Sequence, residues 1–223
     1  MTSSTVENYV RQLYLEQLTS DSEMILMGRL ATVMGVVPGT ATSMVKALAD
    51  AGLVEYQPRG GVRLTASGDK LALLMLRRHR LIELFLVKVL GLDWSTVHEE
   101  ADALEHAISD QVLERIDELL GHPATDPHGD PIPTSKGHVH EPRRMSLASC
   151  PVGKPQRIVR VLDQDPEFLQ FLERQALMPG ATVTVDSREA AAEAVKIRIP
   201  RRHETSLGLA AAAKILVESA ANS

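Results

Sequence analysis

Histidine and carboxylate side chains gather at helical spacing in residues 98–106, His-Glu-Glu-Ala-Asp-Ala-Leu-Glu-His. Asp102 is four residues from His98 and from His106, and three residues from Glu105. Residues three or four apart are neighbours on one face of a helix. The spacing therefore predicts a helix face that presents several ligands for a divalent metal ion.

A second pair of candidate ligands lies upstream, where His79 and Glu83 are also four residues apart. Two helices that each carry a histidine and a carboxylate one turn apart can build a closed divalent-metal site. The alternative is that both are solvated helix faces on which these residue types occur by chance. The presence of two such clusters in one chain favours the metal site.

The composition describes a chain of 223 residues with an aliphatic core, since 44% of residues are hydrophobic and only 3% are aromatic. Cys150 is the one cysteine, which excludes an intramolecular disulfide. No stretch approaches ~18 uninterrupted apolar residues, and the N-terminus has no signal-peptide pattern. We therefore expect a soluble, cytoplasmic protein. The formal net charge of -5 counts against DNA binding, unless the acidic residues are concentrated at metal sites.

The N-terminal third of the chain predicts a winged helix-turn-helix. Two short helices, at 24–35 and 40–51, flank a Val-Val-Pro-Gly turn. Two strands, at 53–56 and 62–65, then form a β-hairpin with a basic tip. An amphipathic helix at 4–18 precedes them all, with a capping box at its start.

The remainder of the chain divides into a helical part, a segment rich in turn-forming residues and a β part. A long apolar helix is expected at 69–90, and the ligand-rich helix and its successor at 96–120. Residues 121–150 are rich in Pro, Gly, His and Asp, which is typical of a linker or an ordered loop. Hydrophobic alternation with period two within 154–218 predicts a small β domain.

Four motifs together resemble a known family. They are Arg77-Arg-His-Arg-Leu-Ile-Glu83, the segment 97–109, the turn Asp126-Pro-His-Gly-Asp-Pro-Ile-Pro133, and the winged helix-turn-helix ending at Gly68. Over essentially its whole length the chain is similar to the metal-dependent regulators of the diphtheria toxin repressor and manganese transport regulator type. The resemblance implies a mostly α fold with a small β part: a winged helix-turn-helix DNA-binding domain at 1–73, a helical metal-binding and dimerisation domain at 74–140, a linker at 141–153 and an SH3-like β domain at 154–223.

The resemblance also implies two metal sites. The primary site would use Asn8, Asp102, Glu105 and His106, and the ancillary site His79, Glu83, His98, Gln164 and Glu167. Arg80 aligns with a residue linked to an anion near the ancillary site. Asn8 departs from the carboxylate usual in manganese-type members, and Glu7 or water is the alternative ligand there.

The donor atoms at Asp102 and Asn8 decide which metal we expect. Iron-type members carry a sulfur ligand at the position of Asp102, whereas both positions here offer only oxygen. Oxygen ligands suit hard ions such as Mn(II). We therefore expect Mn(II), with Fe(II) next, while Zn(II), Co(II), Ni(II) or Cd(II) can substitute in vitro because affinity rises along the Irving–Williams series.

The histidines between the helices and the β domain, at 122, 128, 138 and 140, are open to two interpretations. They could form another metal-binding tract. The surrounding Pro, Gly and Asp residues favour a hydrophilic linker instead.

The DNA-binding surface is expected at the second helix of the motif and at the wing. Candidate contacts are Pro38, Gly39, Thr40, Thr42 and Ser43 for base edges, and Lys46, Arg59 and Arg63 for phosphates. The hydroxyl residues could instead only cap the helix. A dimer on two half-sites is the usual arrangement, and its interface could use Leu84, Phe85, Leu104, Ile108, Val112 and Ile116, unless these residues are only core.

The sequence thus predicts a metal-activated transcriptional repressor that controls metal homeostasis, for example metal-uptake genes. We expect a homodimer on a double-stranded DNA operator, with no enzymatic activity, organic cofactor or membrane partner. Metal would fix an N-terminal helix that is loose in its absence, and the β domain would tune the response. The alternatives are an Fe(II)-responsive regulator of the same family, a dinuclear metalloenzyme, and a winged-helix regulator of another ligand.

Overall fold

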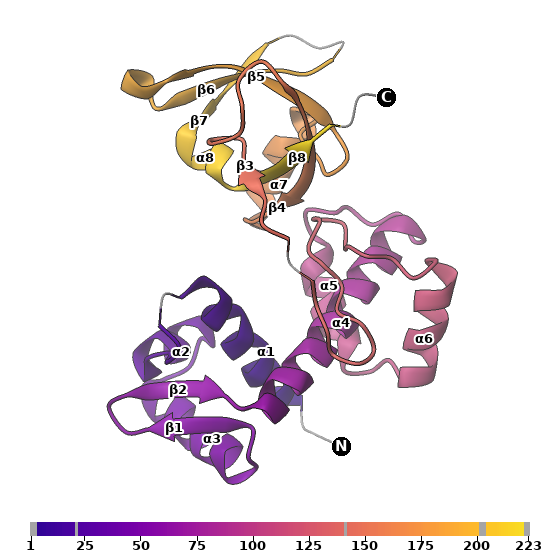
Figure 1. The fold of residues 1–223 in the computed structure, drawn as a ribbon. Helices are drawn as coiled ribbons and strands as arrows, with labels where there is room; N and C mark the ends of the chain where they lie inside the picture. The colour runs from indigo at the N-terminus through magenta and orange to yellow at the C-terminus, as the bar shows by residue number, and fades with distance from the viewer. Residues whose placement is uncertain (1–3, 21, 141, 201–203, 221–223) are drawn as a thin grey trace. The chain divides into compact units, whose positions relative to one another are not determined.

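The computed structural model describes residues 4–20, 22–140, 142–200 and 204–220 (Figure 1). Parts of the expected DNA-binding domain (1–3 and 21), linker (141) and β domain (201–203 and 221–223) lie outside the described residues. Contacts along the chain define two compact units. The first contains residues up to His79 with 105–108 and 132–139, and the second contains 80–104, 109–131 and the chain from His140 onward.

The mostly α fold with a small β part is confirmed, and helices α7 and α8 are additions to the elements expected from the sequence. The helices are α1 (Ser4–Thr19), α2 (Met27–Val33), α3 (Pro38–Asp50), α4 (Ala66–Lys88), α5 (Val97–Glu105), α6 (Asp110–Leu119), α7 (Pro166–Arg174) and α8 (Leu209–Ala213), with a 3-10 turn at Ala190–Ala192. The strands are β1 (Val54–Gln57), β2 (Gly61–Leu64), β3 (Met145–Ser146), β4 (Pro155–Val161), β5 (Thr182–Glu189), β6 (Ala194–Arg198), β7 (Thr205–Gly208) and β8 (Ile215–Ser219).

The winged helix-turn-helix in the first unit consists of α2, α3 and the antiparallel pair β1–β2, with α1 packed against them (Figure 1). Helix α3 begins at Pro38, whose ring suits the first helical position because no backbone N–H is needed there. The helix expected at 24–35 starts later, because Ile25 pairs with Val62 as a short bridge. Their backbone groups exchange hydrogen bonds of 2.9 Å.

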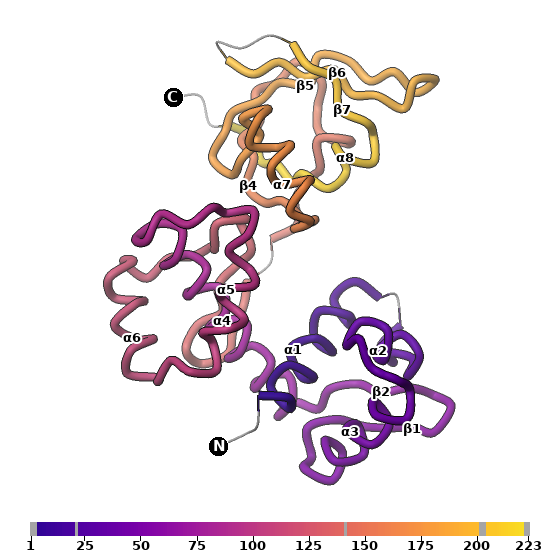
Figure 2. Tube along the Cα trace, turned by 180° about the vertical axis from the view of Figure 1, so that it is seen from behind, coloured from indigo at the N-terminus to yellow at the C-terminus, as the bar shows by residue number. Residues whose placement is uncertain are grey.

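The second unit includes a six-stranded antiparallel sheet with strand order β3-β8-β4-β5-β6-β7. Helix α7 contributes Leu169 and Leu172 to the core beside the sheet, and α8 packs against β6, β7 and β8 (Figure 2). Period-two alternation predicted β4, β5 and β6 correctly. Strands β3, β7 and β8 were missed, and β3, with two residues, is too short to show any alternation.

Residues 126–131 are not a solvated linker. His128 is fully buried, and Asp126 and Asp130 are buried as well. The carbonyl oxygen of His128 accepts a 2.9 Å hydrogen bond from the backbone of Val161 on β4. At Gly129, φ is +88° and an added Cβ would lie 1.9 Å from the carbonyl oxygen of Val159, so this position needs glycine. The hydrophilic-linker interpretation is therefore wrong for His128.

No helix among the described residues is long and apolar enough to cross a membrane.

Candidate metal centre

Helix α1 and the end of α5 bring two expected primary ligands together in the first unit. The Nε2 atom of His106 lies 3.0 Å from Oδ1 of Asn8, and its Nδ1 atom lies 2.7 Å from Oε2 of Glu7. The Glu7 carboxylate thus reaches the same imidazole as the Asn8 amide. Helix α1 therefore offers a carboxylate, Glu7, next to the neutral amide of Asn8.

Glu105, the next expected primary ligand, is almost fully buried in the first unit. Its Oε1 atom is 3.3 Å from Nε2 of His106, and its Oε2 atom is 2.9 Å from Nδ1 of His79. Oε2 also accepts a 2.9 Å hydrogen bond from Arg11, a residue that sequence reasoning did not single out. Asp102 lies one turn earlier on α5, half-buried. Arg78 donates hydrogen bonds to the carbonyl oxygens of Glu105 and Ile108, which positions this end of the helix.

Two of the expected ancillary ligands meet within the second unit. In the second unit, Nδ1 of His98 is 3.1 Å from Oε1 of Glu83, which is buried. The other ring nitrogen of His98 is 3.7 Å from Asp102. His79 lies one turn before Glu83 on α4, as its spacing requires, and its side chain is buried too.

The structure adds a group that sequence reasoning missed, formed by Glu83, Asp126 and His128 in the second unit. Their ligand atoms all lie within 4.8 Å of one another, and all three residues are buried. Oδ2 of Asp126 and Nδ1 of His128 have no hydrogen-bond partner among the described residues. Buried polar atoms are rarely left unpaired. These donor atoms therefore fit a bound cation.

Electrostatics around Asp126 support the same interpretation. Burial raises the pKa of this carboxyl well above its usual range, and the nearby Asp130 and Glu83 raise the pKa further. Arg80 opposes these effects. A divalent ion beside these carboxylates would stabilise their ionised forms.

Arg80 was expected to bind an anion, and it already faces protein groups. It donates to the carbonyl oxygen of Pro131 at 2.6 Å, and its guanidinium lies 3.7 Å from Asp126 and 3.9 Å from Asp130. These carboxylates take the place that a small anion would otherwise fill. Anion binding by Arg80 stays a prediction without support from this arrangement.

Gln164 and Glu167, the ligands expected from the β domain, differ in their distance from the group of Glu83, Asp126 and His128. Gln164 donates a 2.7 Å hydrogen bond to Oδ2 of Asp130, so it approaches the cluster through that carboxylate. Arg160 on β4 forms an ion pair with the same aspartate. Glu167 is exposed on the first turn of α7. The β domain therefore supports the loop at 126–131 through Gln164 and Arg160.

The candidate DNA contacts lie on the surface of the first unit. Pro38, Gly39 and Thr40 are exposed at the start of α3, and Lys46 is exposed further along the helix. The hydroxyls of Thr42 and Ser43 donate back to the carbonyl oxygens of Pro38 and Gly39, at 2.8 and 3.0 Å. In this arrangement the two hydroxyl oxygens can only accept hydrogen bonds from DNA.

The two expected wing arginines differ in their surroundings. Arg59 is exposed with φ of +68°, at the turn between β1 and β2. Arg63 forms ion pairs of 2.8 Å with both Glu23 and Glu55. Arg59 is therefore the freer side chain for phosphate binding, because Arg63 must leave two carboxylates first.

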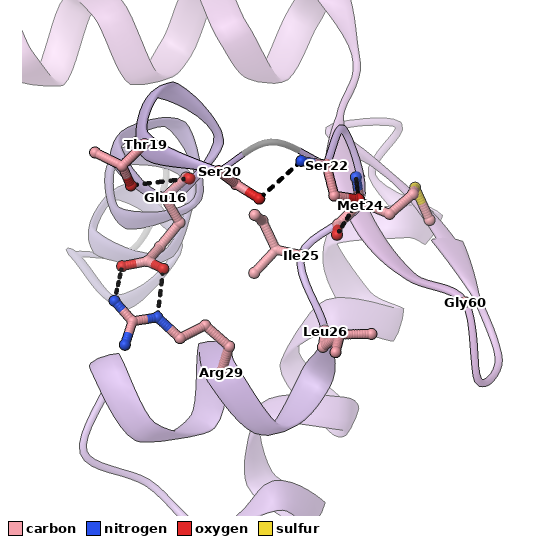
Figure 3. A pocket seen from close by; sticks show the side chains of 9 residues that line it. All are labelled: Glu16, Thr19, Ser20, Ser22, Met24, Ile25, Leu26, Arg29 and Gly60. Carbon is pink, nitrogen blue, oxygen red and sulfur yellow. Dashed lines mark hydrogen bonds and ion pairs between the residues drawn. The ribbon is translucent and has the colours of Figure 1, made fainter.

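A surface cavity of about 450 Å³ lies between the end of α1, the start of α2 and the wing (Figure 3). Its lining includes the ion pair in which Arg29 contacts both carboxylate oxygens of Glu16, at 2.6 and 3.0 Å. None of the expected metal ligands lines it. We take the ion pair as a structural link between α1 and α2.

The iron dependent repressor N-terminal DNA binding domain matches residues 1–62, the iron dependent repressor metal binding and dimerisation domain matches 65–134, and the FeoA domain matches 145–219. The iron-dependent repressor IdeR of Mycobacterium tuberculosis is 32% identical over 215 residues, which cover 91% of this chain and 92% of that protein.

The chain belongs to the family of diphtheria toxin repressor and manganese transport regulators.

Solved structures in this family have the same fold. A manganese-dependent transcriptional repressor in complex with manganese is 37% identical, with a TM-score of 0.85 over 96% of this chain and 100% of that chain. ScaR with bound Cd²⁺ is 32% identical, with a TM-score of 0.78 over 96% of this chain and 99% of that one. Membership confirms the expected function, a metal-dependent DNA-binding repressor, and the family is one of transcriptional repressors.

The sequence contains a signal for some of the missed residues of this repressor. Asp126, His128 and Asp130 lie in a turn that is one of the family motifs, yet the polarity of the turn suggests solvent exposure. Glu7 enters the sequence analysis only as a substitute for Asn8. Arg11 gave no signal, since a single arginine on an amphipathic helix is ordinarily a solvated residue.

Proposed function

We propose that this repressor is activated by Mn(II) bound between α1 and α5, with Asn8, Asp102, Glu105 and His106 as ligands. The observation that carries the proposal is the approach of Asn8 and Glu7 to His106, described above. It joins α1, which packs in the DNA-binding domain, to His106, the last candidate ligand of segment 98–106. The donor set fits a divalent ion because it combines carboxylate, amide and imidazole groups.

A second metal site is proposed around Glu83. Its carboxylate belongs both to the His79–Glu83–His98 set and to the group with Asp126 and His128. Nδ1 of His128 and Oδ2 of Asp126 lack a hydrogen-bond partner among the described residues, which favours direct ligation by these two residues. Gln164 would act through Asp130, and a direct role for Glu167 would require α7 to present it to the cluster.

The choice of Mn(II) rests on hard donor atoms. Asp102 and Asn8 supply oxygen where a sulfur ligand would favour softer ions. Fe(II) is the alternative physiological ion, since relatives in the family include iron-dependent repressors. Zn(II), Co(II), Ni(II) and Cd(II) would bind in vitro because borderline ions accept the same nitrogen and oxygen ligands.

Metal would act through its higher affinity for the conformation that binds DNA. A ligand shifts an equilibrium only by its differential affinity for the two states. Holding α1 against α5 would limit the orientations of the DNA-binding domain and so set the spacing between the two copies of α3 in a dimer. The β domain would tune this response through the contacts of Gln164 and Arg160 with Asp130.

The dimer interface is proposed on the apolar residues that the second unit leaves exposed. Leu84 and Ile116, two of the residues expected there, are buried core residues. Leu104 and Val112 are exposed, and in the same helical segment, residues 84–120, Val89, Leu90 and Leu119 are exposed as well. Exposed leucine and valine side chains on neighbouring helices are typical of a surface that a partner covers.

The remaining functional proposals follow from the family. The repressor would act in the cytoplasm on a double-stranded DNA operator of metal-homeostasis genes, without an organic cofactor. A dinuclear metalloenzyme using the same carboxylates would need an open coordination position and a substrate cleft. It would leave the winged helix without a purpose, so we propose no catalytic role.

The proposal is tested by recovering genomic fragments with chelator-stripped full-length protein, with and without Mn(II), followed by sequencing. Enrichment of a few sites only with Mn(II) is the expected result. Parallel samples with Fe(II) and Zn(II), each at controlled free concentration, would compare the metals. Enrichment of the same fragments with and without each metal would contradict metal activation and favour a regulator of another ligand.

A further inference from the structure

Arg11 on α1 carries a positive charge into the proposed primary site. Its Nη1 atom donates to Oε2 of Glu105 at 2.9 Å and lies 2.8 Å from Nδ1 of His79. The side chain of Glu105 is 1% exposed and that of Arg11 is 12% exposed, so this pair has little contact with water. A buried carboxylate needs a compensating positive charge, and Arg11 supplies it.

The contact with His79 shows that Arg11 also engages a ring nitrogen. The same Nδ1 atom lies 2.9 Å from Oε2 of Glu105, so the guanidinium of Arg11 lies beside both the imidazole and the carboxylate. A metal ion needs a lone pair on an imidazole and on a carboxylate. Arg11 therefore occupies an electron pair of Glu105 and places its positive charge beside His79, and we assign both residues as metal ligands.

We propose that Arg11 is a built-in competitor of the metal ion, and that it sets the metal concentration at which the repressor responds. The inference rests on the proposed function, because it takes Glu105 as a metal ligand. The guanidinium weakens metal binding in two ways: it shares the carboxylate with the metal, and its charge repels a divalent ion held nearby. Removing the charge frees Glu105 and leaves it in need of a cation.

The test measures Mn(II) affinity directly, by competition between full-length protein and a fluorescent chelator. Arg11→Gln and Arg11→Met remove the charge, and Arg11→Lys retains it. Arg29→Gln is the matched control, because Arg29 pairs with Glu16 in the same unit and contacts no proposed ligand. We expect the two neutral variants to bind Mn(II) about 10-fold to 100-fold more tightly, the effect of one nearby charge on a partly buried site.

Variants that keep a positive charge at position 11 should not gain Mn(II) affinity. Arg11→Lys should stay within about threefold of wild type, well below the tenfold step of a removed charge, and Arg29→Gln should match wild type. Thermal unfolding with and without Mn(II) gives a second readout. Mn(II) should raise the melting temperature of a neutral variant by more than it raises that of wild type, even if the variant is less stable without metal.

Two results would overturn the inference. In the first, both neutral variants bind Mn(II) no more tightly than wild type, which would mean that Arg11 does not compete with the metal. In the second, Arg11→Lys gains as much Mn(II) affinity as the neutral variants, which would show that charge is not the cause. If wild type itself binds no Mn(II), the proposed function fails; if wild type binds and the neutral variants gain nothing, only the role of Arg11 fails.

Discussion

The Nε2 atom of His128 lies 2.8 Å from the carbonyl oxygen of Trp94. A carbonyl oxygen can only accept a hydrogen bond, so Nε2 carries the proton and, in the neutral ring, Nδ1 has a free lone pair. Metal-binding histidines commonly fix their tautomer through such a hydrogen bond from the other nitrogen. The partner of His128 therefore prepares Nδ1 to bind a cation beside Glu83 and Asp126.

Binding of Mn(II) at His128 should quench the fluorescence of Trp94, the only tryptophan in the chain. The indole and imidazole rings are stacked with centroids 5.5 Å apart, close enough for a paramagnetic ion on the imidazole to affect the excited indole. A titration followed by tryptophan emission checks this. His128→Phe, which retains a stacking ring, should abolish the quenching, and His138→Phe in the same segment should leave it unchanged. Equal quenching in His128→Phe would exclude His128 as a ligand.

Gly129→Ala should displace the loop that carries Asp126 and His128. Its Cβ would overlap the carbonyl oxygen of Val159, and φ of +88° disfavours any residue with a Cβ. We expect a loss of about 2–4 kcal/mol in the free energy of unfolding, from backbone strain and the displaced contact together, with one Mn(II) ion fewer bound per chain. Urea unfolding and metal analysis of the purified variant measure the two effects.

Gly121→Ala is the matched control for that substitution. Gly121 also has positive φ, at +75°, but nothing lies within 4 Å of an added Cβ. It should cost only about 1 kcal/mol and leave the metal content unchanged. If both variants lost the same stability and retained the same metal, close packing at Gly129 would have no role in the site.

Leu119→Asp should convert the dimer to a monomer. Leu119 is 65% exposed on α6, so the substitution leaves the fold of the subunit intact and places a charge in the proposed interface. Light scattering after size-exclusion chromatography measures the mass. Leu26→Asp is the control, because Leu26 is equally exposed, at 63%, in the first unit. A Leu119→Asp variant that remained dimeric would move the interface elsewhere.

The elements of this fold could largely be predicted, because long helices and regular alternation leave clear patterns. Val6 and Tyr9 lie on the packed face of α1, as the periodicity required. The same periodicity places Leu18 on this face, yet Leu18 is 47% exposed, since it lies in the last turn of α1.

The site could be predicted only in part. His79, Glu83 and His98 follow helical spacing, which is local. The approach of Arg11 to Glu105, across 94 residues of sequence, depends on tertiary packing and has no local pattern. The burial of Asp126 likewise depends on the packing of its loop against β4. The polar residues of this loop give no indication of that packing.

The most direct test of metal activation is DNA binding by wild type and His106→Ala, measured by fluorescence anisotropy while Mn(II) is titrated. The DNA is a fragment enriched by the genomic recovery described above. We predict that wild type binds as Mn(II) is added and dissociates when a chelator removes it. His106→Ala should unfold cooperatively like wild type yet fail to bind the fragment at the same Mn(II) concentrations. A normal response of His106→Ala to Mn(II) would contradict the proposed primary site.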